Sequence, residues 1–464
     1  MKIEKNPNKK LGVFKICMFS IIAVDSIRTL PISAEYGAPL VSFYILAGIL
    51  FLLPCAFVSA ELASTWPEDG GLYIWIRNAF GKKFGFMSAW LLWVYNIIWF
   101  PTLVAFICAT AGAAFMPNIM QHKIILLSAM LAMFWTVTLI NYFGIKWSSL
   151  MSTLGVLIGT LLPMIIIIAL GIYWFSSNKP MAITITLKSL LPNLNSMHNL
   201  GLLTGVLFGL MGIEVSSSFA GDVENPQKNF PRAMFISAAI ILATLIFGSL
   251  TVAMIVPVTE LNLATGVVQA FQIILDKLHM QALLDWVVFF IFIGSLGGLS
   301  TWMAGPSKNM MIAAQDDAAP KFAAKTNRFG AASNMLFTQA IVFTILCSIY
   351  MIFPKFNSAY LLLSNISSQL AIIVYLLLFS AAIKLRYSKP EVPRPFKVPG
   401  GMTGMWLIAG IAFISMVAVF IMGFLPPASM AIVKIKLYET MLLGGVAIVI
   451  ALGLIIAATN NKQK

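Results

Sequence analysis

The sequence predicts an all-α membrane protein with about twelve transmembrane helices, and three observations support this fold class. The chain has 464 residues, 60% of them hydrophobic and only 10% charged, whereas soluble domains carry about 25% charged residues. Its hydrophobic stretches are long and continuous, unlike the alternating strands of a transmembrane β-barrel. Because a bilayer requires every backbone polar group to be satisfied internally, such stretches are expected to cross it as helices.

The predicted transmembrane helices follow from these stretches, because each needs roughly 20 residues. They run over residues 12–36, 40–63, 85–115, 123–141, 149–175, 200–220, 233–257, 284–312, 333–353, 358–384, 402–424 and 438–458. An additional amphipathic helix is expected over Leu261–Met280, between the seventh and eighth spans. The connection Arg386–Gly401 holds four prolines and is expected to be extended. We expect no separate soluble domain, so residues 1–464 form a single transmembrane unit.

Lysine and arginine are distributed unevenly between the two sides of this layout. Of the 30 basic residues, 22 fall on the side of the termini and 7 on the other, while Arg28 lies within the first span. Basic loops stay in the cytoplasm, so both termini are predicted to be cytoplasmic. The net charge of +14 therefore reflects membrane topology, and a nucleic-acid partner is not expected.

Residues that carry enzyme chemistry are sparse. The four cysteines lie within predicted spans without metal-ligand spacing, so neither disulfides nor a metal site are expected. We find no nucleophile elbow, phosphate-binding loop or His/Glu metal motif. Five tryptophans around the third span, among them Trp99, are interpreted as interface anchors and packing residues. The sequence thus indicates a protein that is not an enzyme and requires no cofactor.

The first and sixth spans contain residues that interrupt helices. In the first span, Pro31 removes a backbone donor and disfavours helical geometry at Leu30, shortly after Asp25 and Arg28. In the sixth, the segment Gly209–Ser218 combines glycines, a glutamate and serines. Charges at membrane depth are costly, and we expect them to face a cavity or a partner.

Two interrupted helices at corresponding positions of two five-helix repeats indicate an inverted-repeat transporter. The expected repeats are residues 12–175 and 200–384, followed by two extra helices over 402–458. A broken helix exposes N–H groups on one half and carbonyl groups on the other, which suit a carboxylate and an ammonium group. For the first span, a simple proline kink satisfied by neighbouring helices is the alternative.

Arg28 has three interpretations at this stage. It could neutralise Asp25, three residues earlier on the same helix face. It could instead contact an anionic substrate, or a carboxylate such as Glu214.

Short motifs recur along the chain in a fixed order. They are Ala60–Ala63, Trp66–Gly71, Met211–Glu214, Glu224–Pro226, Phe230–Ala233, Trp302–Ser307, Arg394–Phe396 and Val398–Gly401. Each is weak alone, but together they resemble the amino acid–polyamine–organocation (APC) superfamily over essentially all spans. Within it, the chain is most similar to the bacterial glutamate/γ-aminobutyrate antiporters.

This resemblance implies a LeuT-type fold of five plus five inverted repeats with discontinuous helices 1 and 6, in a bacterial inner membrane. It implies amino-acid exchange by alternating access, with Glu214 as the functional glutamate, Trp302 as the gating tryptophan and Tyr375 as a tyrosine closing the site. The candidate substrate-binding residues are Arg28, Thr29, Pro31, Ser33, Ala34, Met211, Gly212, Glu214, Ser216, Trp302 and Tyr375.

Three features depart from the family pattern. An acidic residue of the eighth span is replaced around Gly297-Gly298, and Arg28 stands where close relatives have aromatic and acidic residues. Because the sequence ends at Lys464, we also expect the long C-terminal plug of these antiporters to be absent. The first two changes make the expected site more positive. We therefore expect it to favour neutral or acidic amino acids over basic ones.

The expected substrate is a small amino acid, either neutral or similar to glutamate and γ-aminobutyrate, and the lipid bilayer is the other expected partner. A proton- or sodium-coupled symporter is the alternative, since Glu214 could titrate and Ser300 and Thr301 could ligate sodium. Such hydroxyl groups more often bond their own backbone. A channel or nutrient receptor is more distant, because paired broken helices favour a closed midplane site over a pore.

Overall fold

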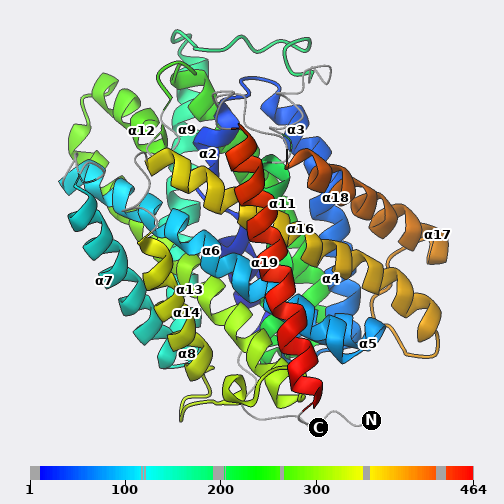
Figure 1. Cartoon of the computed structure of the whole chain (residues 1–464). Helices are drawn as coiled ribbons and strands as arrows, with labels where there is room; N and C mark the ends of the chain where they lie inside the picture. Colours follow the sequence, from blue (N-terminus) through cyan, green and yellow to red (C-terminus); the bar gives the residue numbers. More distant parts are fainter. Residues whose placement is uncertain are drawn as a thin grey trace.

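The computed structural model describes residues 11–115, 119, 122–191, 203, 205–261, 266–348, 356–424 and 435–462. Regular structure within these ranges is helical, apart from a single β-bridge between Leu11 and Val223. The helices form one bundle (Figure 1). In the described ranges, nine helical segments are long and apolar enough to cross a membrane, by length and composition. The protein is therefore an all-helical membrane protein, as predicted.

In the first half of the chain, helices cover the residues of the first five predicted spans, of which all but the first are among these nine segments, and one shorter helix follows the second span. Its elements are α1 (Val13–Val24), α2 (Thr29–Ala34), α3 (Leu40–Ala47), the π-helix η1 (Gly48–Leu52), α4 (Leu53–Thr65), α5 (Gly71–Phe80), α6 (Lys82–Phe115), α7 (Lys123–Tyr142), α8 (Ile145–Leu154), the π-helix η3 (Gly155–Leu161) and α9 (Leu162–Ser176). The first span is thus divided between α1 and α2, whereas α3, η1 and α4 form one continuous second span.

The second half covers the residues of the seven remaining predicted spans, of which all but the sixth and the ninth are among the nine segments long enough to cross a membrane over their described residues. Its elements are the 3-10 helix η4 (Ile213–Asp222), α11 (Pro226–Ile255), α12 (Gly266–Lys277), η5 (Gln281–Leu283), α13 (Leu284–Gln315), η6 (Lys321–Ala324), α14 (Ser333–Cys347), α16 (Phe356–Ser388), α17 (Gly401–Met405), the π-helix η7 (Trp406–Gly410), α18 (Ile411–Met422) and α19 (Ile435–Lys462). The amphipathic helix expected over Leu261–Met280 is confirmed as α12. Residues 262–265 of the expected range lie outside the described residues.

Two connections differ from the expectation. The segment after the second span contains α5, whose apolar side, including Trp75, is buried. This helix was not predicted, because its apolar run is far shorter than a membrane span. Helix α16 continues to Ser388, beyond the predicted end of the tenth span, and only residues 389–400 of the following connection are non-helical.

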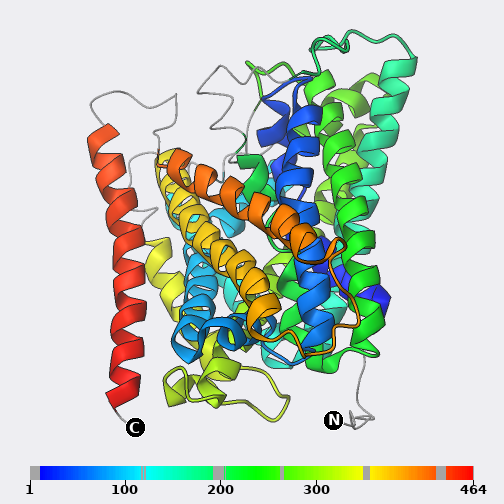
Figure 2. The ribbon, with the colours of Figure 1, turned by 90° about the vertical axis from the view of Figure 1, so that its right-hand side faces the viewer.

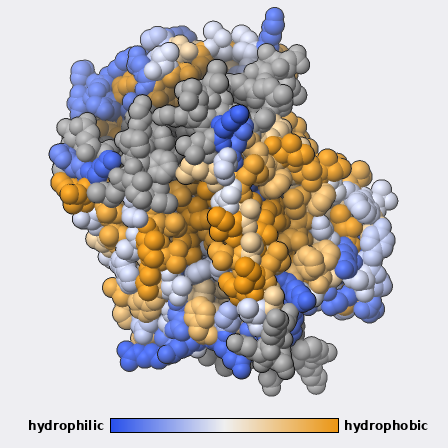
Figure 3. Space-filling model, viewed as in Figure 1, coloured by the Kyte–Doolittle hydropathy of each residue, from blue (hydrophilic) through white to orange (hydrophobic). Residues whose placement is uncertain are grey.

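The surface of the bundle has the character of a membrane protein. On the face shown in Figure 3, hydrophobic side chains gather across the middle and hydrophilic ones lie toward the ends. Large apolar side chains such as Ile124, Ile165 and Ile414 are exposed by more than 60%. Exposed apolar surface of this extent marks contact with lipid. The four cysteines, by contrast, are all buried and unpaired, as predicted.

Helix α6 occupies the centre of the bundle, where it packs against α13 and α16. Helix α19 lies along one edge and packs on α6 and α16 (Figure 2). Helix α13 also packs against η3, and glycines of the two helices meet at this contact. A Cβ atom on Gly159 would lie 2.0 Å from the backbone nitrogen of Gly294, and one on Gly155 would lie 2.9 Å from the Cα atom of Gly297. We call these four residues the glycine seam.

A buried ion-pair network joins the second span to the connection after the tenth. The Glu61 carboxylate, 1% exposed, accepts hydrogen bonds from Arg386 Nε at 2.7 Å and Nη2 at 2.5 Å. It also accepts one from the Val398 backbone N–H at 2.7 Å and lies 3.3 Å from Arg394 Nε. The predicted extended connection is therefore fixed in place by one carboxylate of α4.

Two further ion-pair clusters lie near α5, at the lower end of Figure 1. Lys308 Nζ of α13 contacts Asp69 at 3.0 Å and Asp222 at 2.9 Å. Asp316, directly after α13, accepts hydrogen bonds from Tyr73, Lys82 and Arg77. Burial raises the pKa of Asp316, but these three donors outweigh it and lower the pKa to about 2.

The Glu61 network predicts a large effect of a small substitution. Glu61→Gln preserves the side-chain shape but leaves two arginines without their buried counter-charge, which costs about 3–5 kcal/mol when a buried pair is broken. We expect a clearly lower midpoint of thermal unfolding, followed by tryptophan fluorescence of the purified protein in detergent. Glu68→Gln is the matched control, because Glu68 is 56% exposed and lies 3.8 Å from Arg77. Equal midpoints for the two variants would contradict this account.

Candidate substrate-binding site

The first predicted span is interrupted between α1 and α2. Helix α1 ends at Val24, residues 25–28 are not helical, and α2 begins at Thr29. The expectation of non-helical geometry at Leu30 is wrong, because Leu30 and Pro31 both belong to α2. Proline is tolerated in the first turn of a helix, where its missing N–H would have no helical partner. The interruption therefore falls one turn earlier than predicted, on the charged segment.

The sixth predicted span changes its geometry at Gly212. Residues 205–209 are α-helical, residues 210–212 form a turn, and the 3-10 helix η4 follows. Gly212 has φ +123°, a conformation that side chains other than glycine rarely adopt. A Cβ atom there would also lie 2.6 Å from Trp302 Cζ2. Both the backbone angle and the neighbouring Trp302 indole therefore require glycine at this position.

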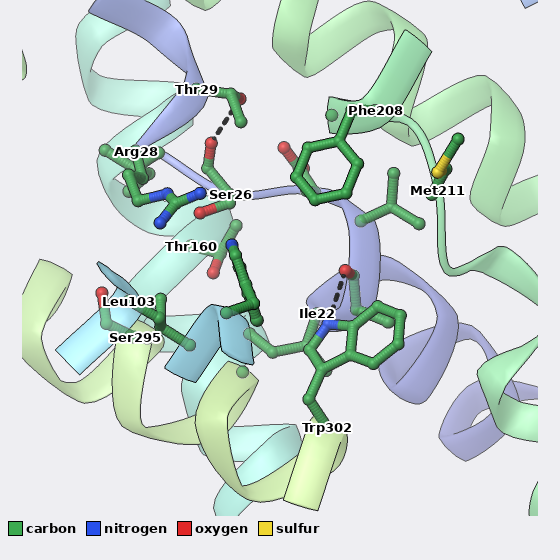
Figure 4. Close-up of a pocket in the computed structure, with 18 of the residues that line it drawn as sticks. Ile22, Ser26, Arg28, Thr29, Leu103, Thr160, Phe208, Met211, Ser295 and Trp302 are labelled. Carbon is green, nitrogen blue, oxygen red and sulfur yellow. Dashed lines mark hydrogen bonds between the residues drawn. The ribbon is translucent and has the colours of Figure 1, made fainter. Parts of the chain in front are cut away.

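A cavity lies where these two interruptions face α6 and α13 (Figure 4). All of residues 22–29 line it, together with Phe208 and Met211 from the sixth span and Trp302 from α13. Helix α6 contributes Tyr95, Asn96, Trp99 and Leu103. The cavity walls are thus mainly apolar and aromatic, with a few polar groups, which is typical of a small-molecule site.

The candidate residues fall into two groups around this cavity. Those that line it are Arg28, Thr29, Met211 and Trp302. Those outside its lining are Pro31, Ser33, Ala34, Gly212, Glu214, Ser216 and Tyr375. Several of the second group are bonded elsewhere: the Ser33 and Tyr44 hydroxyls lie 2.7 Å apart, and the Ser20 hydroxyl donates to Ser216 Oγ at 2.9 Å.

Arg28 places a positive charge in the wall of the cavity. Its side chain is buried, Nη1 donates to Thr102 Oγ1 at 3.3 Å, and the guanidinium carbon lies 5.1 Å from the centre of the Trp99 ring. Both contacts are with α6, and the ring stabilises the cation through its π electrons. Figure 4 shows the guanidinium extending toward Ser26 across the cavity wall.

Asp25 supplies the opposite charge from the same interruption. It is 1% exposed, and Thr244 Oγ1 of α11 donates to its Oδ2 atom at 2.7 Å. Asp25 is therefore anchored to α11, whereas Arg28 is anchored to α6. The two charges line one cavity but are held by different helices.

Trp302 connects the two interruptions. Its indole Nε1–H donates to the Ala23 carbonyl at 3.0 Å, near the end of α1, while its ring lies against Gly212. The rings of Tyr95 and Trp99 pack edge-on against it, each with centroids 6.2 Å away. The indole thus satisfies a carbonyl group at the first interruption and closes one side of the cavity.

Glu214 and Tyr375 meet each other, but they lie outside the lining of the cavity. Tyr375 Oη donates to Glu214 Oε1 at 2.8 Å, and the Cys55 thiol lies 3.7 Å from Oε2. Glu214 is 2% exposed and Tyr375 1% exposed. The pair forms a buried polar contact, with Glu214 two residues beyond Gly212.

The hydroxyl groups considered as sodium ligands have protein partners. Ser300 Oγ donates to Asn141 Oδ1 at 3.1 Å. Thr301 Oγ1 lies 2.6 Å from Ser152 Oγ and donates to the Gly297 carbonyl at 3.1 Å. This arrangement ties α13 to α7 and α8. Among the described residues, no group of three or more His, Cys, Asp or Glu side chains could hold a metal ion.

The contribution of α6 to the cavity was missed in the sequence. Trp99 was assigned to packing, and Tyr95 and Asn96 were not considered, yet all three line the cavity. Asn96 carries the signal that could have found them, because a polar amide in the middle of a span is expected to face a cavity or a partner.

Comparison with known proteins decides the family. The model of the amino acid permease family matches residues 11–453. The chain belongs to this family. It is 42% identical to an uncharacterized transporter of Legionella pneumophila over 99% of both chains. It is 28% identical to a glutamate/gamma-aminobutyrate antiporter of Lactococcus lactis over 98% of this chain and 92% of that protein. A probable agmatine/putrescine antiporter of Lactococcus lactis is also 28% identical, over 84% of this chain and 83% of that protein.

Membership of this permease family has direct consequences. The protein is a multi-pass membrane transporter of amino acids or polyamines, and not an enzyme. The family also implies a LeuT-like fold, with which the interruptions of the first and sixth spans agree.

Substituting Trp302 should impair this permease without unfolding it. Trp302→Phe keeps an aromatic ring but leaves the buried Ala23 carbonyl without its donor, which costs about 1–3 kcal/mol. We expect uptake of a mixture of radiolabelled amino acids into proteoliposomes to fall about tenfold. Trp286→Phe, at a residue 59% exposed on the same helix, should retain normal uptake. Undiminished uptake by Trp302→Phe would show that the indole hydrogen bond has no role in transport.

Proposed function

We propose that this permease is an antiporter that exchanges small amino acids, either neutral or similar to glutamate and γ-aminobutyrate, across a bacterial inner membrane. The observation that carries the proposal is the cavity between two interrupted helices, with a buried cation in its wall. Interrupted helices present backbone N–H and carbonyl groups at membrane depth, where they can bind the two charged ends of an amino acid. The similarity to a glutamate/gamma-aminobutyrate antiporter over nearly the whole chain supports exchange.

Arg28 favours an amino acid over a polyamine as the substrate. A polyamine carries only positive charges, which a buried guanidinium repels strongly in a medium of low dielectric constant. A carboxylate, by contrast, gains a charge-assisted hydrogen bond from the same group. We therefore propose that Arg28 recognises the substrate carboxylate, and that basic amino acids are disfavoured.

The other candidate residues act around this contact in the proposed mechanism. In this mechanism Trp302, which lines the cavity and lies against Gly212, moves its ring so that the substrate can reach the Glu214–Tyr375 pair. Thr29 and Met211 complete the cavity wall. The remaining candidates, Pro31, Ser33, Ala34, Gly212 and Ser216, shape the two interrupted helices, which are equivalent elements of the proposed repeats 12–175 and 200–384.

Alternating access requires that one end of the bundle stays closed while the other is open. We propose that the Lys308 cluster closes the end that carries the termini, which the basic loops assign to the cytoplasm. Lys308 links Asp69, before α5, to Asp222, at the end of η4. Leu11 is bound to the same segment, because its backbone N–H donates to the Asp222 carbonyl at 3.2 Å. The start of α1, the end of η4 and α13 are thus held together.

Exchange is tested by counterflow in proteoliposomes. Vesicles loaded with unlabelled amino acids and placed in symmetric, sodium-free buffer should accumulate external label, since an antiporter needs only the internal substrate. The screen covers the twenty amino acids and their decarboxylation products, and empty vesicles are the control. Strict dependence on sodium or on a proton gradient would reject antiport in favour of symport. Preferred exchange of arginine or lysine would reject the assigned substrate class.

The closing role of Lys308 predicts a change in cysteine labelling. Lys308→Met removes the charge that bridges two carboxylates, so α1, whose start is tied to Asp222 through Leu11, should leave its packed position more often. We expect N-ethylmaleimide to label Cys17, a residue of α1 that is 4% exposed, several times faster than in the unchanged protein. Mass spectrometry measures the rate, and Lys321→Met, at an exposed residue, is the control. Unchanged protection of Cys17 would contradict the closing role.

A further inference from the structure

Asp25 is the second charged residue in the cavity, and the proposed mechanism has so far given it no task. Its Oδ2 atom accepts the hydrogen bond from Thr244, while Oδ1 is buried and has no hydrogen-bond partner among the described residues. A buried carboxylate oxygen without a donor is costly. Because Asp25 lines the cavity, a donor that enters the cavity can supply the missing hydrogen bond.

The placement of the two charges defines what kind of donor fits. Asp25 is held by Thr244 of α11, and Arg28 is held by Thr102 and Trp99 of α6. These contacts anchor the carboxylate and the guanidinium to different helices, so a ligand can lie between them. A molecule with one ammonium and one carboxylate group matches both charges.

The cavity also contains a second unsatisfied acceptor. Asn96 lines the cavity, its Nδ2 atom donates to the Leu92 carbonyl at 2.6 Å, and its buried Oδ1 atom has no partner among the described residues. An ammonium group has three donors and accepts nothing. Unsatisfied acceptors on two elements of the lining are therefore chemically suited to an ammonium group.

We propose that Asp25 binds the amino group of the substrate, and that Thr244 positions its carboxylate for this contact. The inference rests on the proposed amino-acid exchange and narrows it, because it makes a free amino group a requirement for recognition. Carboxylic acids that lack this group have no partner for Asp25 and are excluded. Thr244 is a positioning residue in this account, since it acts only through Asp25.

The test compares ligands that differ only in their amino group. Inhibition constants are measured in proteoliposomes that exchange radiolabelled glutamate or γ-aminobutyrate, with glutarate and butyrate as the deaminated competitors. The unchanged protein should prefer the amino compounds strongly. Asp25→Asn removes the charge-assisted contact, so the preference for each amino compound over its deaminated analogue should fall at least about tenfold. Asp285→Asn, at an exposed residue of α13, should leave the preference unchanged.

Thr244→Val provides a second and independent test of the role of Asp25. It removes the hydrogen bond to Oδ2 but keeps the shape of the side chain, so the preference should fall in the same direction by about threefold or more. If Asp25→Asn does not fold, as judged by gel filtration, Thr244→Val decides the question. A purely structural role of Asp25 would lower the amount or rate of all exchange and leave the ratio of inhibition constants unchanged.

The outcomes separate this inference from the function on which it rests. Exchange by the unchanged protein with an unaltered ratio in the folded variants would overturn the role of Asp25 and leave the antiporter intact. If the unchanged protein exchanges no amino acid at all, both proposals fall. Exchange that requires sodium, with the requirement lost in Asp25→Asn, would show that the carboxylate binds a cation and not the substrate.

Discussion

A helix that is interrupted inside a membrane leaves backbone polar groups where water cannot reach them, and each must find another partner. In this permease, the Trp302 indole meets this constraint for the first span by donating to the Ala23 carbonyl. The same ring lies against Gly212, where the sixth span changes its geometry. One side chain of α13 thereby holds two interrupted segments in register. The position of the cavity between them depends on this contact.

A second constraint on the structure is that every charge buried in the bundle needs a partner. Charged side chains within the bundle are held by specific donors, acceptors or aromatic rings, as Glu61 is by two arginines and Arg28 is by Thr102 and Trp99. Near α5, the ion pairs of Lys308 and Asp316 join segments that are far apart in the sequence. The charges in the cavity lie in the middle of the spans, while the dense clusters lie at one end. In the proposed mechanism, substrate recognition and closure therefore depend on separate groups of residues.

Much of this organisation is predictable from the sequence, because hydrophobic length and breaker residues act locally. The helical class, the helix α12, the interruption at Gly212 and the unpaired cysteines all follow from composition and spacing. The interruption of the first span was placed one turn late, because Pro31 was taken as its cause. In the structure that proline begins α2, and the charged residues occupy the non-helical turn. Contacts between distant spans, such as Thr244 with Asp25, leave no local pattern in the sequence. For the contribution of α6 to the cavity, the polar residue Asn96 in the middle of a span is the one signal that the sequence offers.

The glycine seam has a consequence for how much this transporter can vary. Gly159 and Gly294 lie against each other and also line the cavity, so at this place the wall is bare backbone. The separation of the two helix axes there is set by peptide groups in van der Waals contact, with no side chain as a spacer. A single methyl group added at either position would wedge η3 away from α13 and widen the chamber. The width of the cavity at this wall thus depends on the absence of side chains from Gly159 and Gly294. Related chains can change this width by replacing either glycine with alanine.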